Sequence, residues 1–217
     1  MSDVKGTGRR QYRSEVREQG ARRTRQLIVA AARELFLRNG YRATSLADVA
    51  AEAGVARPTV FAAYGSKPAL LKQVLDEALA GDDEPVPVAQ RPWFQPVWQA
   101  TTPAQALDAY ADVCVLIAQR AAAVFEIVRR AADDSPEVAA LWQTVQSNRR
   151  AGARMVIAHA AALGPLTPDY TDDQAVDLMW LLNDPAHYAA LVDESGWPAA
   201  AYRDWLASAM RDILLRR

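Results

Sequence analysis

The chain has 217 residues, of which 51% are hydrophobic, with a single cysteine and a formal net charge of −1 at pH 7. One cysteine excludes an internal disulfide framework and fits a reducing compartment. No apolar run approaches the ~18 residues that a membrane span needs, and no apolar stretch follows the basic N-terminus as in a signal peptide. We therefore expect a cytoplasmic protein without a membrane partner.

The net charge hides an asymmetry between two parts of the chain. Residues 1–80 hold 14 Lys and Arg against 8 Asp and Glu, whereas residues 81–217 hold 11 against 18. This division predicts a polyanionic partner for the first part alone. Solvated surface charge is the alternative interpretation.

Residues 1–21 are polar and show no periodicity, so we expect a disordered basic arm. From about Arg22, apolar residues at helical spacing predict a helix that Asn39-Gly40 ends. The stripe consists of Ile28, Ala31, Ala32, Leu35 and Phe36.

Three shorter helices follow the first. Thr44 or Ser45 caps the second helix, which ends at Gly54. Pro58 lies in the first turn of the third, where its missing N–H leaves no hydrogen bond unmade. Gly65 ends that helix and Ser66 caps a fourth, which runs to about residue 80.

The second part of the chain starts with a proline-rich connection and then reads as helical throughout. Helices are predicted over 103–132 with a bend near Ala121, over 135–163, over 171–183, and from about 199 to the C-terminus. Asp184-Pro185 is predicted to break the helix and start another, which Gly196-Trp197-Pro198 ends. No stretch alternates with the period of a strand, so we expect an all-α fold. The predicted domains are the arm 1–21, a head of residues 22–80 and a body of residues 81–217.

A short helix, a glycine turn and a second short helix form a helix-turn-helix arrangement. Each helix is too short to be stable alone, so the flanking helices must hold the pair. Such a unit presents the first turn of its second helix to the major groove of double-stranded DNA. There Arg57 can bind guanine, and Thr59 can reach a phosphate or a thymine methyl. A helical hairpin used only for packing is the alternative.

The segment from Thr24 to Leu79 resembles the DNA-binding head of the TetR family of bacterial repressors. The resemblance rests on RQLIVAAARELFLRNGYRATSLADVAAEAGVARPTVFAAYGSKPALLKQVL. More loosely, LLNDPAHYAALVDESGWPAAAYRDWLASAM resembles the closing helices of an actinobacterial version of the family. The resemblance implies a homodimer that carries two DNA-binding heads on a helical, ligand-sensing body.

The family's DNA contacts map onto particular residues of this chain. The DNA-binding candidates are Thr44, Ser45, Arg57, Pro58, Thr59, Phe61, Ala63, Tyr64 and Lys67, with Thr44, Ser45 and Lys67 on phosphates. The family has Tyr where this chain has Phe61, and Phe where it has Tyr64. Phe61 has thus lost a phosphate-binding hydroxyl, and Tyr64 either replaces it or is a core residue with its hydroxyl hydrogen-bonded internally. Because the third helix has few long side chains, we expect Arg57 and Thr59 to read bases, helped by DNA shape and the arm.

In the body, the resemblance implies that the helix at 171–183 and the last helix pair with their copies in a dimer; a purely internal core is the alternative. The ligand-binding candidates are Trp98, Tyr110, Phe125, Trp142, Met155 and His159, although aromatic residues at helical spacing are more often core. Their apolar character predicts a small apolar or aromatic ligand.

The function that we expect is a ligand-responsive DNA-binding regulator, released from a near-palindromic operator by that ligand. A ligand-independent DNA-binding or DNA-organising protein is the alternative. An enzyme is not expected, because the two histidines are far apart, neither HExxH nor CxxC occurs, and Cys114 reads as buried. We likewise expect no cofactor, no metal site and no catalytic residue.

Overall fold

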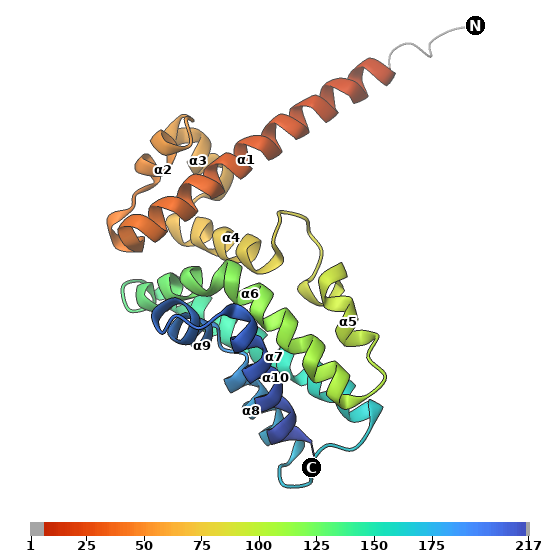
Figure 1. The fold of residues 1–217 in the computed structure, drawn as a ribbon. Helices are drawn as coiled ribbons and strands as arrows, with labels where there is room; N and C mark the ends of the chain where they lie inside the picture. Colours follow the sequence, from red (N-terminus) through yellow and green to blue (C-terminus); the bar gives the residue numbers. More distant parts are fainter. Residues whose placement is uncertain (1–6, 216–217) are drawn as a thin grey trace, which may run out of the picture. The chain divides into compact units, whose positions relative to one another are not determined.

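The computed structural model describes residues 7–215, with side chains described from Arg17 onward. Within this range the backbone forms helices, turns and loops and no strand, so the all-α prediction is confirmed (Figure 1). The contacts divide the chain between Val74 and Leu75, which lies inside helix α4 (Lys67–Ala80) rather than after it. Over the described residues, no helix has both the length and the apolar character that crossing a bilayer requires.

The first unit contains α1 (Thr7–Ala43), α2 (Leu46–Glu52), α3 (Arg57–Tyr64) and the start of α4 (Figure 1). The helix begins at Thr7, whereas the sequence predicted disorder up to residue 21, and this is a correction. Arg, Gln and Glu make up eight of the fifteen residues 7–21 and are good helix formers. Extending a stable helix needs no new nucleus, and this advantage outweighs the cost of about 1 kcal/mol for each of Gly8 and Gly20. Residues 1–6 of the predicted arm lie outside the described range.

The break at Gly40 is as predicted, with a positive φ of 79°. A side chain is strained in this conformation, whereas glycine adopts it freely. Upstream of the break, the apolar stripe of α1 fills the core of the unit. The core consists of Ile28, Ala32, Leu35 and Phe36 from α1, Val49 from α2, Val60 from α3, and Leu70, Leu71 and Val74 from α4.

Two of the caps predicted in the head are present. Ser45 caps α2 in a box with Asp48, so the choice between Thr44 and Ser45 falls on Ser45. Ser66 accepts a hydrogen bond from the Ala69 N–H at the start of α4. Each satisfies an N–H that the first turn of a helix leaves without a partner.

The second unit starts with the proline-rich connection. It contains two short turns, η1 (Val88–Gln90) and η2 (Pro92–Phe94), and the single-turn helix α5 (Gln95–Trp98). Arg91 is buried there, where it forms an ion pair of 2.6 Å with Asp82 and donates to the Val86 carbonyl at 3.0 Å. Arg91, which lies within the connection, thus donates hydrogen bonds to the backbone of the connection.

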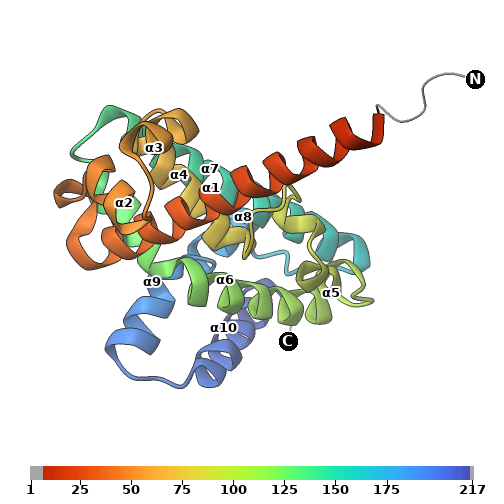
Figure 2. The ribbon, with the colours of Figure 1, turned by 90° about the horizontal axis from the view of Figure 1, so that it is seen from above.

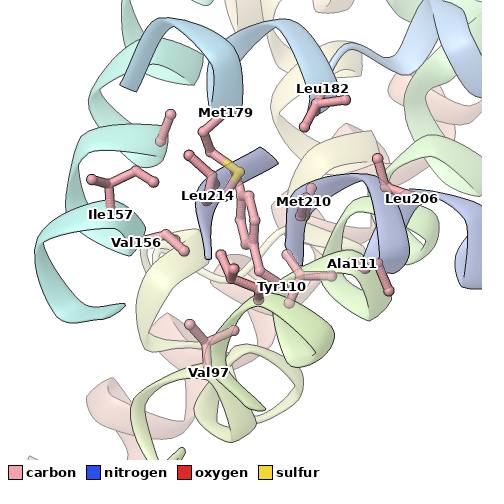
Figure 3. Close-up of a cluster of buried hydrophobic side chains, with 14 of the residues drawn as sticks. Val97, Tyr110, Ala111, Val156, Ile157, Met179, Leu182, Leu206, Met210 and Leu214 are labelled. Carbon is pink, nitrogen blue, oxygen red and sulfur yellow. The ribbon is translucent and has the colours of Figure 1, made fainter. Parts of the chain in front are cut away.

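The remainder of the unit is a layered bundle. It comprises α6 (Pro103–Ala131), α7 (Pro136–Leu163), α8 (Asp172–Leu182), α9 (Pro185–Tyr188), the π-helical turn η3 (Ala189–Glu194) and α10 (Ala199–Leu214). α6 packs against both α7 and α10 (Figure 2), and α8 packs against α7. α6 continues as one helix through Ala121, where the sequence predicted a bend. Side chains from α5, α6, α7, α8 and α10 converge in one buried apolar cluster (Figure 3).

Candidate functional site

Helix α3 has one side packed on the head and the other open. Val60 is fully buried, and the half-buried Tyr64 donates from its hydroxyl to the Arg25 carbonyl of α1 at 3.3 Å. The Tyr64 hydroxyl is thus hydrogen-bonded within the head, which is the second of the two roles predicted for it. Gly54, with a φ of 66°, forms the turn, and the Val55 N–H closes it onto the Ala50 carbonyl at 3.0 Å.

The exposed positions of α3 include the predicted DNA-binding residues of this helix other than Tyr64. Arg57, Pro58, Thr59, Phe61 and Ala63 are all exposed, and Phe61 is 64% exposed. The head therefore presents these five positions together, from one rigid helix. Since Ala56 gives α3 no side-chain cap, its first turn is not covered by a capping group.

Thr44 and Lys67, two residues predicted to contact phosphates, form internal hydrogen bonds in the structure. Thr44 is 2% exposed, and its hydroxyl lies 2.9 Å from the Gly40 carbonyl and 3.3 Å from that of Leu35. The Lys67 ammonium donates to the carbonyls of Tyr41 and Thr44, both at 2.9 Å, and lies 4.2 Å from the centre of the Tyr41 ring. In the structure both residues hold the end of α1 against the start of α2, and the phosphate contacts predicted for them stay predictions.

Ser45 is exposed at the start of α2, but its polar groups already have partners. Its N–H and its hydroxyl both donate to the Asp48 carboxylate, at 2.8 and 2.7 Å. The hydrogen bonds from Ser45 hold the pKa of Asp48 below its ordinary value, so the carboxylate stays ionised. A phosphate at Ser45 would have to displace this carboxylate.

The six ligand candidates do not form one cluster. Trp98 meets His159 edge to face with ring centres 5.2 Å apart, and Phe94 lies against both Trp98 (5.0 Å) and Tyr110 (6.2 Å).

Phe125 and Trp142 form a separate pair at 6.4 Å. It lies about 15 residues further along α6 than Tyr110, or about 22 Å. Met155 is 47% exposed on α7. The structure thus links Trp98, Tyr110 and His159 through Phe94, and it leaves Phe125 and Trp142 as a separate pair and Met155 exposed.

Beside Tyr110 lies a buried polar network that the sequence analysis did not identify. The Arg149 side chain, 10% exposed, donates to the Trp180 carbonyl and to the Asn183 amide oxygen, both at 2.9 Å, and pairs with Asp184 at 3.1 Å. Asn183 in turn donates to the Tyr110 hydroxyl at 2.9 Å. Burial lowers the pKa of Arg149 and raises that of Tyr110.

A signal for this network was present in the sequence. Arg149 lies four residues after Val145 and four before Ala153, and both neighbours are buried. An arginine at a core position of an amphipathic helix must find buried partners, because an unpaired buried charge is too costly.

Comparisons with known proteins place this geometry in a family. The family model described as "Bacterial regulatory proteins, tetR family" matches residues 28–74, which run from α1 into α4. Among curated proteins, no sequence matches the chain.

Solved structures with the same fold cover most of the chain. A protein from Saccharomonospora viridis in complex with choline is 18% identical, with a TM-score of 0.68 over 89% of this chain and 98% of its own. NalD, the secondary repressor of the MexAB-OprM multidrug efflux pump in Pseudomonas aeruginosa, is 20% identical, with a TM-score of 0.66; the match covers 90% of this chain and 98% of NalD. SmeT, solved in complex with triclosan, is 17% identical, with a TM-score of 0.69; the match covers 89% of this chain and 92% of SmeT.

The matched segment contains the whole helix-turn-helix described above, and the structural matches extend the shared fold through the helical body. Residues 28–74 thus match the model of the tetR family of bacterial regulatory proteins, and the chain shares the fold of these solved structures over most of its length.

Proposed function

We propose that this chain is a ligand-responsive transcriptional repressor that binds a near-palindromic operator as a homodimer. The observation that carries the proposal is the open side of α3, which presents Arg57 and Thr59 while Val60 anchors the helix from behind. Arg57 has the planar fork of donors that guanine O6 and N7 accept. The basic balance of residues 1–80 supports a polyanionic partner for this face.

Selection of DNA from a random duplex pool by the purified protein tests DNA binding. We expect enrichment of two related half-sites about one helical turn apart. Arg57→Ala should lower affinity for the selected site by about 1–3 kcal/mol and relax the preference at one base pair in each half-site. Arg129→Ala, which removes an exposed arginine from the body, is the matched control. No enrichment, or an unchanged base preference in Arg57→Ala, would contradict the proposed readout.

The dimer is supported by apolar side chains left open on α8 and α10. Leu181 is 54% exposed and Trp205 is 37% exposed, on the two helices that the family resemblance assigns to the interface. Sedimentation at micromolar concentration should show a dimer, and Leu181→Glu should shift it toward monomer. Val86→Glu, at another exposed apolar position outside these helices, should leave the dimer intact. A monomeric wild type would refute this part of the proposal.

The ligand is proposed to be a small, largely apolar or aromatic molecule that binds beside Trp98, Tyr110 and His159. The Nε2 atom of His159 is buried, and it has no hydrogen-bond partner among the described residues. An aromatic surround with one unsatisfied polar atom fits an apolar ligand that carries one hydrogen-bonding group. Two proteins of this fold have been solved with small organic molecules, one with choline and one with triclosan.

Thermal-shift screening of a mixed library, followed by DNA-release measurements on each hit, tests the ligand proposal. A ligand can shift the DNA-binding equilibrium only by its differential affinity for the two states, typically 1–3 kcal/mol. We expect apolar hits that stabilise the protein and weaken DNA binding. If every hit were strongly polar, the apolar assignment would fail. If no hit altered DNA affinity, the ligand-independent alternative would be favoured.

A further inference from the structure

We propose that Phe61 reads thymine methyl groups in the major groove, so that each operator half-site carries a thymine beneath the second turn of α3. This inference rests on the proposed DNA-binding function and specifies the chemistry of its target. Among the large apolar side chains of the described residues, Phe61 is the most exposed, at 64%; the next, Leu181, is at 54%. It occurs on the one helix that the fold presents as a recognition element.

The geometry of α3 determines what Phe61 can reach. Val60 and Tyr64, four residues apart, define the side that faces the head. At 100° per residue, the opposite side carries Pro58 and Ala62. Phe61 lies between the side that faces the head and this outward side. The outermost stripe is therefore made of small side chains, which lets the helix backbone approach the base edges closely. A phenyl ring on the flank of such a helix lies beside the groove floor rather than far above it.

The chemistry of this surface is largely apolar. Arg57 is its single long donor, and the remaining exposed side chains are those of Pro58, Thr59, Phe61, Ala62 and Ala63. In the major groove, the thymine C5-methyl is the one apolar group that a base edge offers. A phenyl ring has no donor for a phosphate oxygen, but it gains free energy when it and a methyl group are removed from water together.

The experiment uses the duplex that the full-length protein selects from the random pool. Deoxyuridine replaces each thymine in turn, in both half-sites symmetrically, which removes the methyl and leaves base pairing unchanged. Losing one buried methyl corresponds to about 0.8 kcal/mol, or roughly fourfold in affinity. We therefore expect one thymine position at which the substitution weakens binding by about fourfold per half-site, and little effect elsewhere.

Protein variants show whether Phe61 makes this contact. Phe61→Ala should remove the uracil effect at that position, so that thymine and uracil duplexes bind equally, and Phe61→Leu should keep part of it. Leu37→Ala, which truncates another exposed apolar side chain of the head, is the matched control and should keep the full effect. Because Phe61 and Leu37 are both exposed, these variants should retain the wild-type circular dichroism spectrum.

The outcomes separate this inference from the function on which it rests. If no DNA sequence is enriched, the proposed function fails. If a site is enriched but lacks thymine beneath α3, or uracil substitution has no effect, the function stands and the methyl readout is overturned. A uracil effect that persists unchanged in Phe61→Ala overturns the assignment to Phe61, as does a Phe61→Ala variant that weakens thymine and uracil duplexes by the same factor.

Discussion

Replacing Lys67 by methionine tests whether this residue holds the helix-turn-helix together or binds DNA. The change removes the ammonium and keeps an unbranched apolar side chain of similar length. In the structure that ammonium donates to two backbone carbonyls, of Tyr41 and Thr44, and lies over the Tyr41 ring. These carbonyls lie at the end of α1 and just before α2, so the loss of the two hydrogen bonds should loosen the start of α2.

The magnitude follows from these contacts. A hydrogen bond to a charged group contributes about 1.5–3 kcal/mol, and a cation–π contact of a partly exposed group about 0.5–1 kcal/mol. Lys67 is half-buried, and water can reach part of the site in the variant. We therefore expect a loss of about 2–3 kcal/mol in the free energy of opening the head, or roughly 30- to 140-fold faster exchange by the tenfold rule of 1.4 kcal/mol.

Hydrogen exchange on the full-length protein measures this directly. Peptides that cover residues 41–50 and 57–64 should lose protection, whereas peptides from α6 and α7 should not. Tryptophan fluorescence supplies a second readout, because all six tryptophans lie beyond residue 92 and report on the body alone. Lys72→Met, at an exposed lysine of the same helix, is the control and should change protection little.

A phosphate contact would give a different result. If Lys67 bound DNA, the variant would keep its protection, and the slope of log K against log salt would flatten by about 0.9 for each phosphate lost. Unchanged protection in the head would therefore refute the structural role derived from the hydrogen bonds.

Three further predictions concern the body and the N-terminal helix. Arg149→Met should lower the free energy of unfolding by about 3 kcal/mol, since it leaves buried polar partners unpaired; urea titration should show a far smaller effect for Arg150→Met, whose ion pair is partly exposed. Desolvation raises the pKa of the Cys114 thiol from 9.0 to about 12. The folded state thus keeps a proton that the unfolded chain releases, so the free energy of unfolding should fall as pH rises from about 9 towards 12. In titrations across this range, Cys114→Ala should remove the part of this fall that comes from the thiol. Deleting residues 1–20 should flatten the salt dependence of DNA binding in gel-shift titrations and leave the body folded, and an unchanged slope would show that the segment does not contact DNA.

The head could be predicted closely from the sequence because its signals are local. Gly40, Gly54 and Gly65 all have positive φ values at the ends where helices were predicted to stop. Caps at Ser45 and Ser66 were equally readable, since a cap depends on residues two or three positions away. The arm was the exception, because a polar sequence without periodicity is compatible both with disorder and with the extension of an existing helix.

The roles of Thr44 and Lys67 could not be read from spacing. Both have side chains suited to phosphate, and both lie at helix starts, where phosphate binding is common. Their actual partners are backbone carbonyls, at Gly40 for one and at Tyr41 for the other. A hydroxyl or an ammonium can satisfy either kind of acceptor, and only the folded chain shows which one it meets.

The end of α8 shows the same limit over a longer distance in the chain. The last carbonyls of a helix have no partner within it, and a positive charge near them is favourable. Here Arg149 of α7 supplies that charge, donating to the Trp180 carbonyl in the last turn of α8 and to the Asn183 side chain just beyond it. The Asn183 amide then reaches Tyr110 on α6. The break between α8 and α9 is therefore stabilised from two other helices, so a local rule that predicts the break at Asp184-Pro185 cannot predict what holds it.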